Sequence, residues 1–349
     1  ILFKFKDKII TFVLVKLLRK ILFPLNPLYY LAIYIRNKCF DFGVFSSKTY
    51  EMPIICVGNL SVGGTGKTPM VEYLIQMLKP SRSLAVLSRG YGRKTDGFIL
   101  ADSKSTAQIL GDEPFQIAQK FPEIRVAVDA DRRHGIKSLK TLDNPAKIII
   151  LDDAFQHRAV KAGLSIILTS YDNLYCQDVV LPAGNLREPR SAASRAQIIV
   201  VTKCPEDLPD SKKQWIKDCL RPMLGQQLFF SSIVYSQTII AKKKTQPLEW
   251  LKNQKFSLVT GIAKAAPMVN YLENLGLVFE HLEFSDHHVF SNKELDLIGS
   301  KSIVLTTEKD FSRLESLHHP ALYYLPINIQ INASVEFETL VADYIKKFD

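Results

Sequence analysis

The sequence predicts an α/β protein with a doubly wound, mostly parallel sheet, a second, smaller α/β domain and an N-terminal amphipathic helix. Short apolar runs alternate with helical patterns from residue 52 onward, and several of these runs lack polar alternation. Strands that are apolar on both sides suit a sheet covered by helices on both faces. The pattern changes after Lys203, which indicates a second unit.

The larger domain is expected at residues 51–235. Charged, helical residues follow at 204–225, and segments 226–236 and 242–250 suggest a ribbon or linker. Helical patterns occupy 69–79 and 113–121, and the strand candidates are 53–59, 84–90, 125–130, 146–153, 164–170 and 196–203.

The smaller domain is expected at residues 236–325. Residues 1–50 are expected to form an N-terminal membrane-associating segment, and residues 326–349 a C-terminal strand and helix that return to the first domain. Within the smaller domain, strands are expected at 256–264, 277–285 and 302–310, with helices near 266–275 and 292–299.

Residues 1–22 predict an amphipathic helix. With about 3.6 residues per turn, Lys16, Arg19 and Lys20 share one face, opposite a stripe of leucine and isoleucine. A basic stripe beside an apolar stripe is typical of a helix in the membrane interface. The longest uncharged run, Ile9–Val15, is too short to span a bilayer. The alternatives are a helix that covers the core and a signal peptide, which the interrupting charges disfavour.

The composition is that of a folded protein with an acidic partner. The 349 residues are 47% hydrophobic and 23% charged, which argues against wholesale disorder. A net charge of +10 indicates nucleic acid, anionic lipid or a phosphorylated ligand, without choosing among them. The five cysteines form no CxxC pair, which favours a reduced compartment and no structural zinc.

Residues 61–68 predict a phosphate-binding loop, and the sheet is therefore expected to be of the P-loop type. The G-x-x-x-x-G-K-[ST] pattern fits except that a serine replaces the first glycine. An apolar strand precedes the loop and a helix follows, whose free N–H groups attract phosphate. The alternative is a glycine-rich turn with an incidental lysine. We predict that ATP binds at Ser61, Val62, Gly63, Gly64, Thr65, Gly66, Lys67 and Thr68.

A second apolar run, at 148–153, ends in Asp152 and Asp153. P-loop enzymes hold Mg²⁺ with a carboxylate at such a strand end and with the hydroxyl that follows the loop lysine. We therefore predict Mg²⁺ as a cofactor, with Thr68, Asp152 and Asp153 as the metal residues. A strand that ends in a solvated turn is the alternative.

Other nucleotide-binding classes fit less well. The stretch 200–207 resembles the guanine-reading NKxD motif, but Thr202 replaces the asparagine and Pro205 the aspartate. Regulatory ATPases with a GGxGKT loop usually carry a lysine where this chain has Val62. Some polar residues outside the phosphate loop have no assigned role so far. Asp112 begins a predicted helix, where it is either an N-cap or a functional carboxylate. Arginines at 132, 133, 187, 190 and 195 either face solvent or bind phosphate.

Together the motifs identify a family. In order they are VGNLSVGGTGKTP, SRGYGR, GDEP, DADRRHG, LDDAFQHR, LPAGNLREP, FSDHH and TEKD. This set resembles the tetraacyldisaccharide 4'-kinase family of lipid A biosynthesis from about residue 25 to 310, and Ser61 also belongs to that family's loop. Asn185 departs from the pattern, where proline is often expected.

The resemblance implies a reaction and a site. ATP would phosphorylate the 4'-hydroxyl of a tetraacyl glucosamine disaccharide 1-phosphate, at the cytoplasmic face of the bacterial inner membrane. Asp112 would accept the hydroxyl proton and form a dyad with His287. Contacts with substrate or phosphate would come from Glu113, Arg132 (or Arg133), Gln156, His157 and Arg187.

Two rival classes remain. One is a membrane-surface P-loop NTPase switch that has no small-molecule acceptor. The other is a nucleic-acid-binding protein, which the charge suggests but which lacks an interleaved aromatic and basic motif. We expect no nucleic acid and no obligatory protein partner.

Overall fold

The computed structural model describes residues 19, 21–80, 82–242, 244–286 and 288–349. The amphipathic helix expected over residues 1–22 lies almost wholly outside the described residues. A short 3-10 helix, η1 (Phe23–Leu25), leads into helix α2 (Asn26–Asp41). Among the described helices, none combines the length and the hydropathy needed to cross a membrane.

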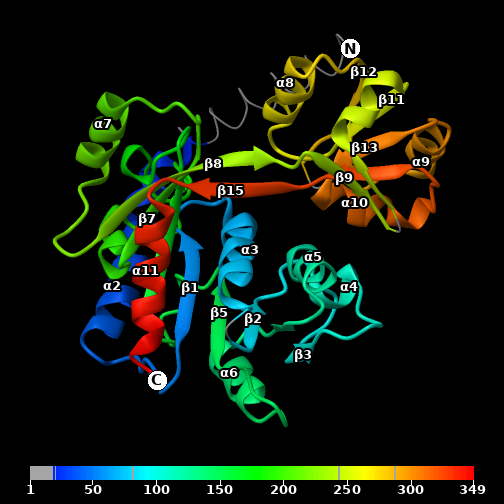
Figure 1. Cartoon of the computed structure of the whole chain (residues 1–349). Helices are drawn as coiled ribbons and strands as arrows, with labels where there is room; N and C mark the ends of the chain where they lie inside the picture. The colour runs from blue at the N-terminus through cyan, green and yellow to red at the C-terminus, as the bar shows by residue number, and fades with distance from the viewer. Residues whose placement is uncertain (1–18, 20, 81, 243, 287) are drawn as a thin grey trace.

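Among the described residues, nine strands form one large sheet in the order β15-β8-β7-β6-β1-β5-β2-β4-β3 (Figure 1). All neighbours pair in parallel except β15 with β8 and β3 with β4. The predicted mostly parallel sheet is thus confirmed. The strands are β1 (Ile54–Asn59), β2 (Leu84–Ser88), β3 (Ile99–Leu100), β4 (Arg125–Val128), β5 (Ile148–Asp152), β6 (Leu164–Ser170), β7 (Ile198–Cys204), β8 (Gln227–Tyr235) and β15 (Ile327–Ile331).

Helices cover both faces of this sheet, and β1 shows how. Its residues Ile54 and Cys56 point into one apolar cluster, while Ile55 and Val57 point into the other. The first cluster includes side chains of α6 (Arg132–Lys140) and α7 (Asp210–Leu220); the second includes side chains of α3 (Lys67–Leu78), α5 (Asp112–Lys120) and α11 (Ser334–Lys346). A strand without polar alternation therefore lies between two helical layers.

The second sheet of the described chain has the order β10-β9-β14-β13-β11-β12. Its central pairs are parallel, and β9 joins antiparallel to both β10 and β14. Its strands are β9 (Thr238–Ala241), β10 (Lys244–Pro247), β11 (Phe256–Thr260), β12 (Phe279–Glu283), β13 (Val304–Thr307) and β14 (Leu322–Leu325). Its helices are α8 (Ala266–Asn274), α9 (Asn292–Gly299) and α10 (Glu308–Leu314), with η4 (Leu248–Asn253) and η5 (Glu315–Leu317).

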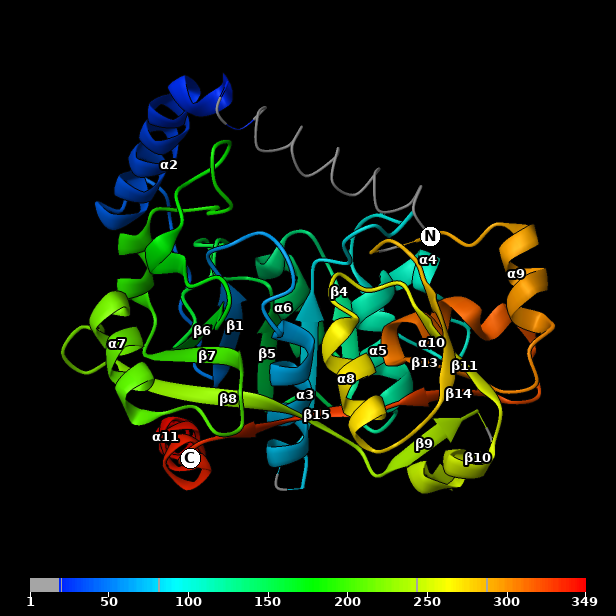
Figure 2. The same cartoon turned by 90° about the horizontal axis from the view of Figure 1, so that it is seen from above.

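The chain crosses between the two sheets twice. It leaves the large sheet at the end of β8 and returns as β15, which pairs antiparallel with β8 (Figures 1 and 2). Helix α11 then packs on the large sheet through Phe337, Val341 and Ile345. The expected four-part division and its limits stay a prediction.

Three expectations change. The segment 226–236, expected as a ribbon or linker, contains β8, which pairs in parallel with β7. The segment 302–310, expected as a strand, ends as β13 at Thr307, and Glu308 begins α10. Cys176 and Cys219 form a disulfide although they are 43 residues apart, a pairing that the cysteine pattern did not predict. Neither residue lies in a motif that indicates pairing.

The remaining short helices are α4 (Ala107–Leu110), η2 (Tyr175–Gln177) and η3 (Arg190–Arg195).

Candidate active site

The loop between β1 and α3 has the conformation of an anion-binding turn. Gly63 and Gly66 have φ values of 103° and 84°, in the left-handed region that glycine adopts without strain. A Cβ placed on Gly63 would meet no atom within 4 Å, so space beside the loop is open. Helix α3 begins at Lys67, directly after Gly66. The first N–H groups of α3 and the positive end of its dipole therefore face the loop.

The outer side of the loop is held by the segment that follows β6. The buried Ser61 forms an isolated antiparallel bridge with Leu186. The Val62 N–H donates to the carbonyl of Asn185 at 2.8 Å, while the Val62 side chain stays 45% exposed. The serine at the first glycine position thus occupies a strand-like bridge, where glycine is not needed.

The inner side of the loop is held by residues that the sequence did not single out as a site. Asn59 Nδ2 donates to Thr65 Oγ1 at 2.7 Å. Thr202 Oγ1 donates to the Thr65 carbonyl at 2.8 Å, and Lys203 Nζ donates to the Gly64 carbonyl at 2.6 Å. The stretch that resembles a guanine-reading motif therefore supports the phosphate loop instead.

A cluster of opposite charges lies beside the loop. Lys67 Nζ is 3.7 Å from Asp153 Oδ2, and Arg187 donates to both Asp153 oxygens, at 2.7 and 3.1 Å. Arg187 also donates to Asn59. Burial would raise the pKa of Asp153, but the hydrogen bonds from Arg187 and the charge of Lys67 outweigh it and lower that pKa. Two cations and one carboxylate thus lie together beside the loop.

Asp152 ends β5 in a different environment. Its side chain is buried, Oδ2 accepts from Ser88 Oγ at 3.1 Å, and Oδ1 has no hydrogen-bond partner. Burial, followed by the nearby charges of Glu113 and Asp153, raises the pKa of Asp152 to about 7. A buried carboxylate oxygen without a donor is suited to a cation.

The residues present fit Mg²⁺. Thr68, the second residue of α3, and Asp152 offer the oxygen ligands that this ion prefers. Among the described residues, no group of three or more His, Cys, Asp or Glu side chains is placed to hold a metal. Mg²⁺ takes one or two protein ligands and completes its shell with phosphate and water, which fits the two oxygens of Thr68 and Asp152.

Arg132 has partners other than the expected substrate. Its side chain is buried, and it donates to the carbonyls of Asp129 and Asp152 at 2.8 and 3.3 Å. Burial lowers its pKa to about 10. The guanidinium therefore fixes the backbone at the end of β5. The neighbouring Arg133 is exposed and lies 3.9 Å from Asp131.

Gln156 and His157 follow β5 and point to different neighbours. Gln156 Nε2 donates to the carbonyl of Asn59 at 2.8 Å, at the end of β1. His157 Nε2 lies 4.0 Å from Asp131 Oδ1. Burial, followed by the charge of Arg132, lowers the pKa of His157, so its imidazole is neutral near pH 7.

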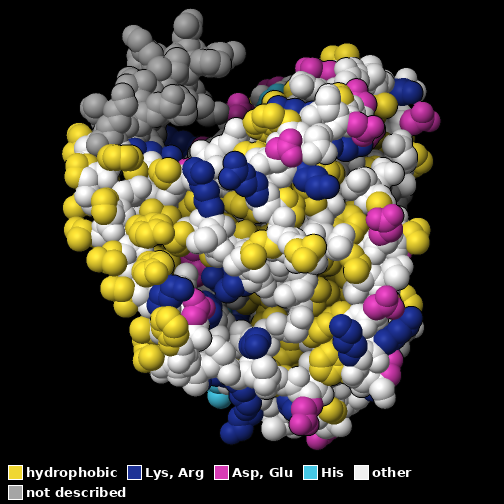
Figure 3. Space-filling model, turned by 90° about the vertical axis from the view of Figure 1, so that its left-hand side faces the viewer, with side chains coloured by type: hydrophobic (Ala, Val, Ile, Leu, Met, Phe, Trp, Pro, Cys, Tyr) yellow, Lys and Arg dark blue, Asp and Glu magenta, His cyan; other side chains and the backbone are white. Residues whose placement is uncertain are grey.

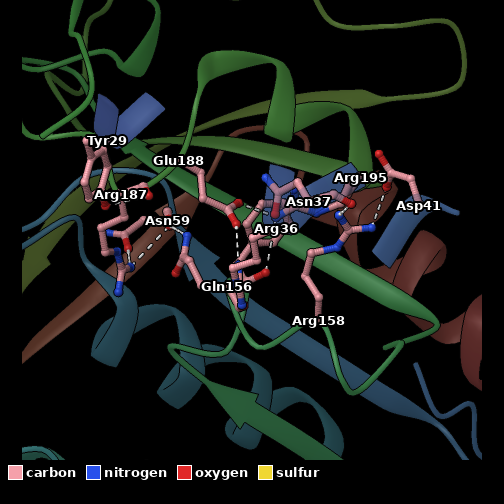
Figure 4. Close-up of polar contacts among 11 residues, drawn as sticks. Tyr29, Arg36, Asn37, Asp41, Asn59, Gln156, Arg158, Arg187, Glu188 and Arg195 are labelled. Atoms are coloured by element: carbon pink, nitrogen blue, oxygen red, sulfur yellow. Dashed lines mark hydrogen bonds and ion pairs between the residues drawn. The ribbon is translucent and has the colours of Figure 1, made fainter. Parts of the chain in front are cut away.

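Helix α2 is bonded to this part of the site (Figure 4). Arg36 donates to the Gln156 carbonyl at 2.7 Å and lies 3.5 Å from Glu188, a fully buried carboxylate that also pairs with Arg195. Tyr29 donates to the carbonyl of Arg187 at 3.1 Å. No sequence pattern indicated these contacts of α2, because their partners are more than a hundred residues away.

Asp112 and Glu113 are the first two residues of α5. The N-cap is Gly111, with φ of 91°, and no side chain caps the helix. The N-cap alternative for Asp112 is therefore wrong. Asp112 Oδ2 accepts from Arg313 Nη2 at 2.9 Å. This hydrogen bond links α5, which packs on the large sheet, to α10 of the second sheet. The charge of Glu113 contributes to the raised pKa of Asp152 at the end of β5.

His287, the expected partner of Asp112, lies outside the described residues. Its neighbour Asp286 lies 3.6 Å from Lys309 on α10. His288 lies 2.9 Å from Glu294, and Glu294 also accepts from Ser291 in the capping box of α9. His288 therefore supports the start of α9.

These features define a P-loop nucleotide-binding protein. A glycine loop connects a central parallel strand to a helix, a lysine stands at the helix start, and a carboxylate ends the adjacent strand. The family model "Tetraacyldisaccharide-1-P 4'-kinase" matches residues 18–346. The chain belongs to this family, as its motifs predicted.

Similar proteins cover nearly the whole chain. It is 50% identical to the tetraacyldisaccharide 4'-kinase of Flavobacterium johnsoniae, over 95% of this chain and 98% of that protein. It is 42% identical to the protein of the same name from Bacteroides thetaiotaomicron, over 95% and 94% of the two chains. The crystal structure of LpxK from Aquifex aeolicus in complex with ATP superposes with a TM-score of 0.78 at 30% identity, covering 94% of this chain and 99% of that one.

Proposed function

We propose that this protein transfers the γ-phosphate of ATP to the 4'-hydroxyl of tetraacyldisaccharide 1-phosphate, which yields lipid IVA. One observation carries the proposal: the loop at 61–68 leads into α3 so that Lys67 lies beside Asp153, which also pairs with Arg187, within a chain that matches the kinase family over residues 18–346. The similar LpxK structure that contains ATP supports ATP as the phosphate donor.

The phosphate loop would bind the donor. Backbone N–H groups at Gly63, Gly64 and Gly66 and at the start of α3 would hold the β- and γ-phosphates, with Lys67 as their counter-ion. Thr68 and Asp152 would hold Mg²⁺, which neutralises charge on the phosphates when bound. The γ-phosphate would compete with Asp153 for Lys67 and Arg187, and this exchange would order both cations around the nucleotide.

Asp112 would act as general base. As the acceptor oxygen bonds to the γ-phosphorus, the bond from that phosphorus to the β-phosphate bridging oxygen breaks, ADP leaves, and the hydroxyl proton passes to Asp112. His287 would form a dyad with this carboxylate. Gln156, His157, Arg132 and Glu113 would shape the site around the phosphates, Arg132 through the backbone of β5 that it holds.

The acceptor would be met at a membrane surface. Several large apolar side chains at residues 21–35, in and just before η1 and α2, are exposed to solvent. Figure 3 shows hydrophobic side chains gathered along one edge of the face that it draws. The opposite side of α2 bonds to Gln156 and Arg187, close to the phosphate loop. We propose that α2 contacts the cytoplasmic face of the inner membrane, where the acylated acceptor resides. The exposed residues are Ile21, Phe23, Leu25, Leu28, Tyr30, Leu31, Tyr34 and Ile35.

The test is ATP turnover with and without the disaccharide monophosphate in detergent micelles. We expect ADP release that depends on the lipid and matches the amount of phosphorylated lipid formed. Strong turnover without lipid, and no labelled lipid product, would instead establish a P-loop NTPase switch.

The role of Asp112 has a matched control. Asp112→Ala should lower lipid phosphorylation by about 10²-fold or more while it leaves ATP affinity nearly unchanged. Asp210→Ala removes a carboxylate from the same position of α7, where the side chain is 96% exposed, and should have no effect. If the two substitutions had equal effects on lipid phosphorylation, Asp112 would not be the general base.

A further inference from the structure

Helices α5 and α10 pack together where the two sheets meet, and ion pairs join both ends. Figures 1 and 2 show the two helices side by side. Asp112 at the start of α5 lies 2.9 Å from Arg313 near the end of α10, and Lys120 at the end of α5 lies 3.0 Å from Glu308 at the start of α10. The helices are therefore antiparallel. Each carboxylate lies at a helix N-terminus and each cation near a C-terminus, as the helix dipoles favour.

Arg313 is fixed from behind by a buried carboxylate. Asp310 is fully buried, and its Oδ2 accepts from the Gly261 N–H at 2.8 Å and from Thr307 Oγ1 at 2.7 Å. Its other oxygen, Oδ1, accepts from Arg313 Nη1 at 3.3 Å. The ends of β11 and β13 thus determine where Asp310 lies, and Asp310 determines where the guanidinium lies.

The guanidinium bridges two carboxylates with two different nitrogens. Nη1 bonds to Asp310 and Nη2 bonds to Asp112, while the Arg313 side chain is only 14% exposed. The planar fork of arginine makes both bonds at once, with a fixed direction for each. A lysine in its place would offer one flexible ammonium group and would lose the direction of at least one bond.

We infer that Arg313 is a positioning residue for the phosphoryl transfer: it holds the Asp112 carboxylate in the direction from which it accepts the acceptor's proton. The inference rests on the proposed role of Asp112. Arg313 acts through Asp112, because Nη2 bonds to this base while Nη1 bonds to Asp310, which is held at the strand ends of the second sheet. Small displacements of a reacting group lower the rate far more than they lower substrate binding.

Kinetics of Arg313→Gln and Arg313→Lys test this inference in the full-length protein. The glutamine variant should lose about 10- to 100-fold in kcat, with KM for ATP changed less than about threefold. The lysine variant should recover part of the loss, because it keeps the charge but not the two directed bonds. Lys242→Gln, which breaks the ion pair between Lys242 after β9 and Glu315 of η5, is the matched control and should leave kcat unchanged.

A double-substitution cycle separates positioning from a general structural role. If Arg313 acts through Asp112, then Asp112→Asn combined with Arg313→Gln should be no slower than Asp112→Asn alone. Multiplicative losses, or a kcat for Arg313→Gln equal to that of the wild type, would overturn the inference. A loss of ATP affinity and melting temperature that parallels the loss of kcat would also overturn it.

The activity of the single variant Asp112→Asn distinguishes a failure of the proposed role of Asp112 from a failure of the proposed role of Arg313. Full activity of that variant would remove Asp112 as the base, and with it the ground for Arg313. A large loss in Asp112→Asn, together with an unaffected Arg313→Gln, would leave the proposed function intact and refute only the inference.

Discussion

Glu72 on α3 offers a quantitative test of the packing between the phosphate-loop helix and the second sheet. Its side chain is only 4% exposed, and Lys120 Nζ lies 2.7 Å from it and 3.0 Å from Glu308. Burial, followed by the charge of Glu308, raises the pKa of Glu72 from 4.5 to about 7 even though Lys120 acts in the opposite direction. One lysine is thus shared between two carboxylates at the junction.

The raised pKa makes stability depend on pH with a definite sign. The folded protein keeps the Glu72 proton up to about pH 7, whereas the unfolded chain releases it near the ordinary value of 4.5. The free energy of unfolding therefore falls as pH rises from about 4.5 to 7 and is constant above that range. At about 1.4 kcal/mol per pH unit, the full effect of this one group is about 3 kcal/mol.

The perturbation is Glu72→Gln, which keeps the shape and removes the titration. Denaturant unfolding at pH 5 and pH 8 should show that the wild type loses up to about 3 kcal/mol relative to the variant. The comparison between the two proteins cancels the titrating groups that do not interact with Glu72.

Glu123→Gln is the control for this experiment. Glu123 is exposed, and its hydrogen bond from Lys79 lowers its pKa, so its effect should be smaller and opposite in sign. A wild-type-to-Glu72→Gln difference that is equal at both pH values, or that favours the wild type at pH 8, would refute the reasoning.

Three further outcomes are expected. Lys67→Met should lower lipid-dependent ADP release by about 10²-fold or more, because it removes the cation that faces the transferred phosphate; an unchanged rate would contradict this. Gly58→Ala should destabilise the protein by about 1–3 kcal/mol in denaturant unfolding, since the added Cβ would lie 2.6 Å from Phe155 Cβ. Unchanged stability would mean that the neighbouring backbone shifts to make room for the methyl group. Leu28→Glu combined with Leu31→Glu should weaken sedimentation with anionic vesicles without loss of activity in detergent; equal sedimentation would reject α2 as the membrane contact.

Local patterns predicted much of the large sheet. Its central strands are continuous apolar runs because both faces are covered, and each run was found within a few residues of its observed limits. The phosphate loop was equally readable, since glycines, lysine and threonine must lie at fixed spacing between a strand and a helix.

Other elements gave no comparable signal. The segment 226–236 carries exposed and polar residues because β8 lies near the sheet's edge, so it resembled a linker. Glu308 and Asp310 looked like a strand end, but Thr307 caps a helix there: its side chain accepts from the Asp310 N–H.

The sequence by itself determined the central strands of the large sheet, the phosphate loop, the carboxylates at the end of β5 and the family. These features depend on residues that are close in sequence, where spacing alone fixes geometry. Only the tertiary structure decided that Arg187 bonds to Asp153, that Arg132 is buried against the backbone and that Arg313 bonds to Asp112. Those contacts join residues that are far apart in sequence, so local spacing cannot fix them: the first two depend on the packing of the large sheet, and the third on the packing of α10 against α5.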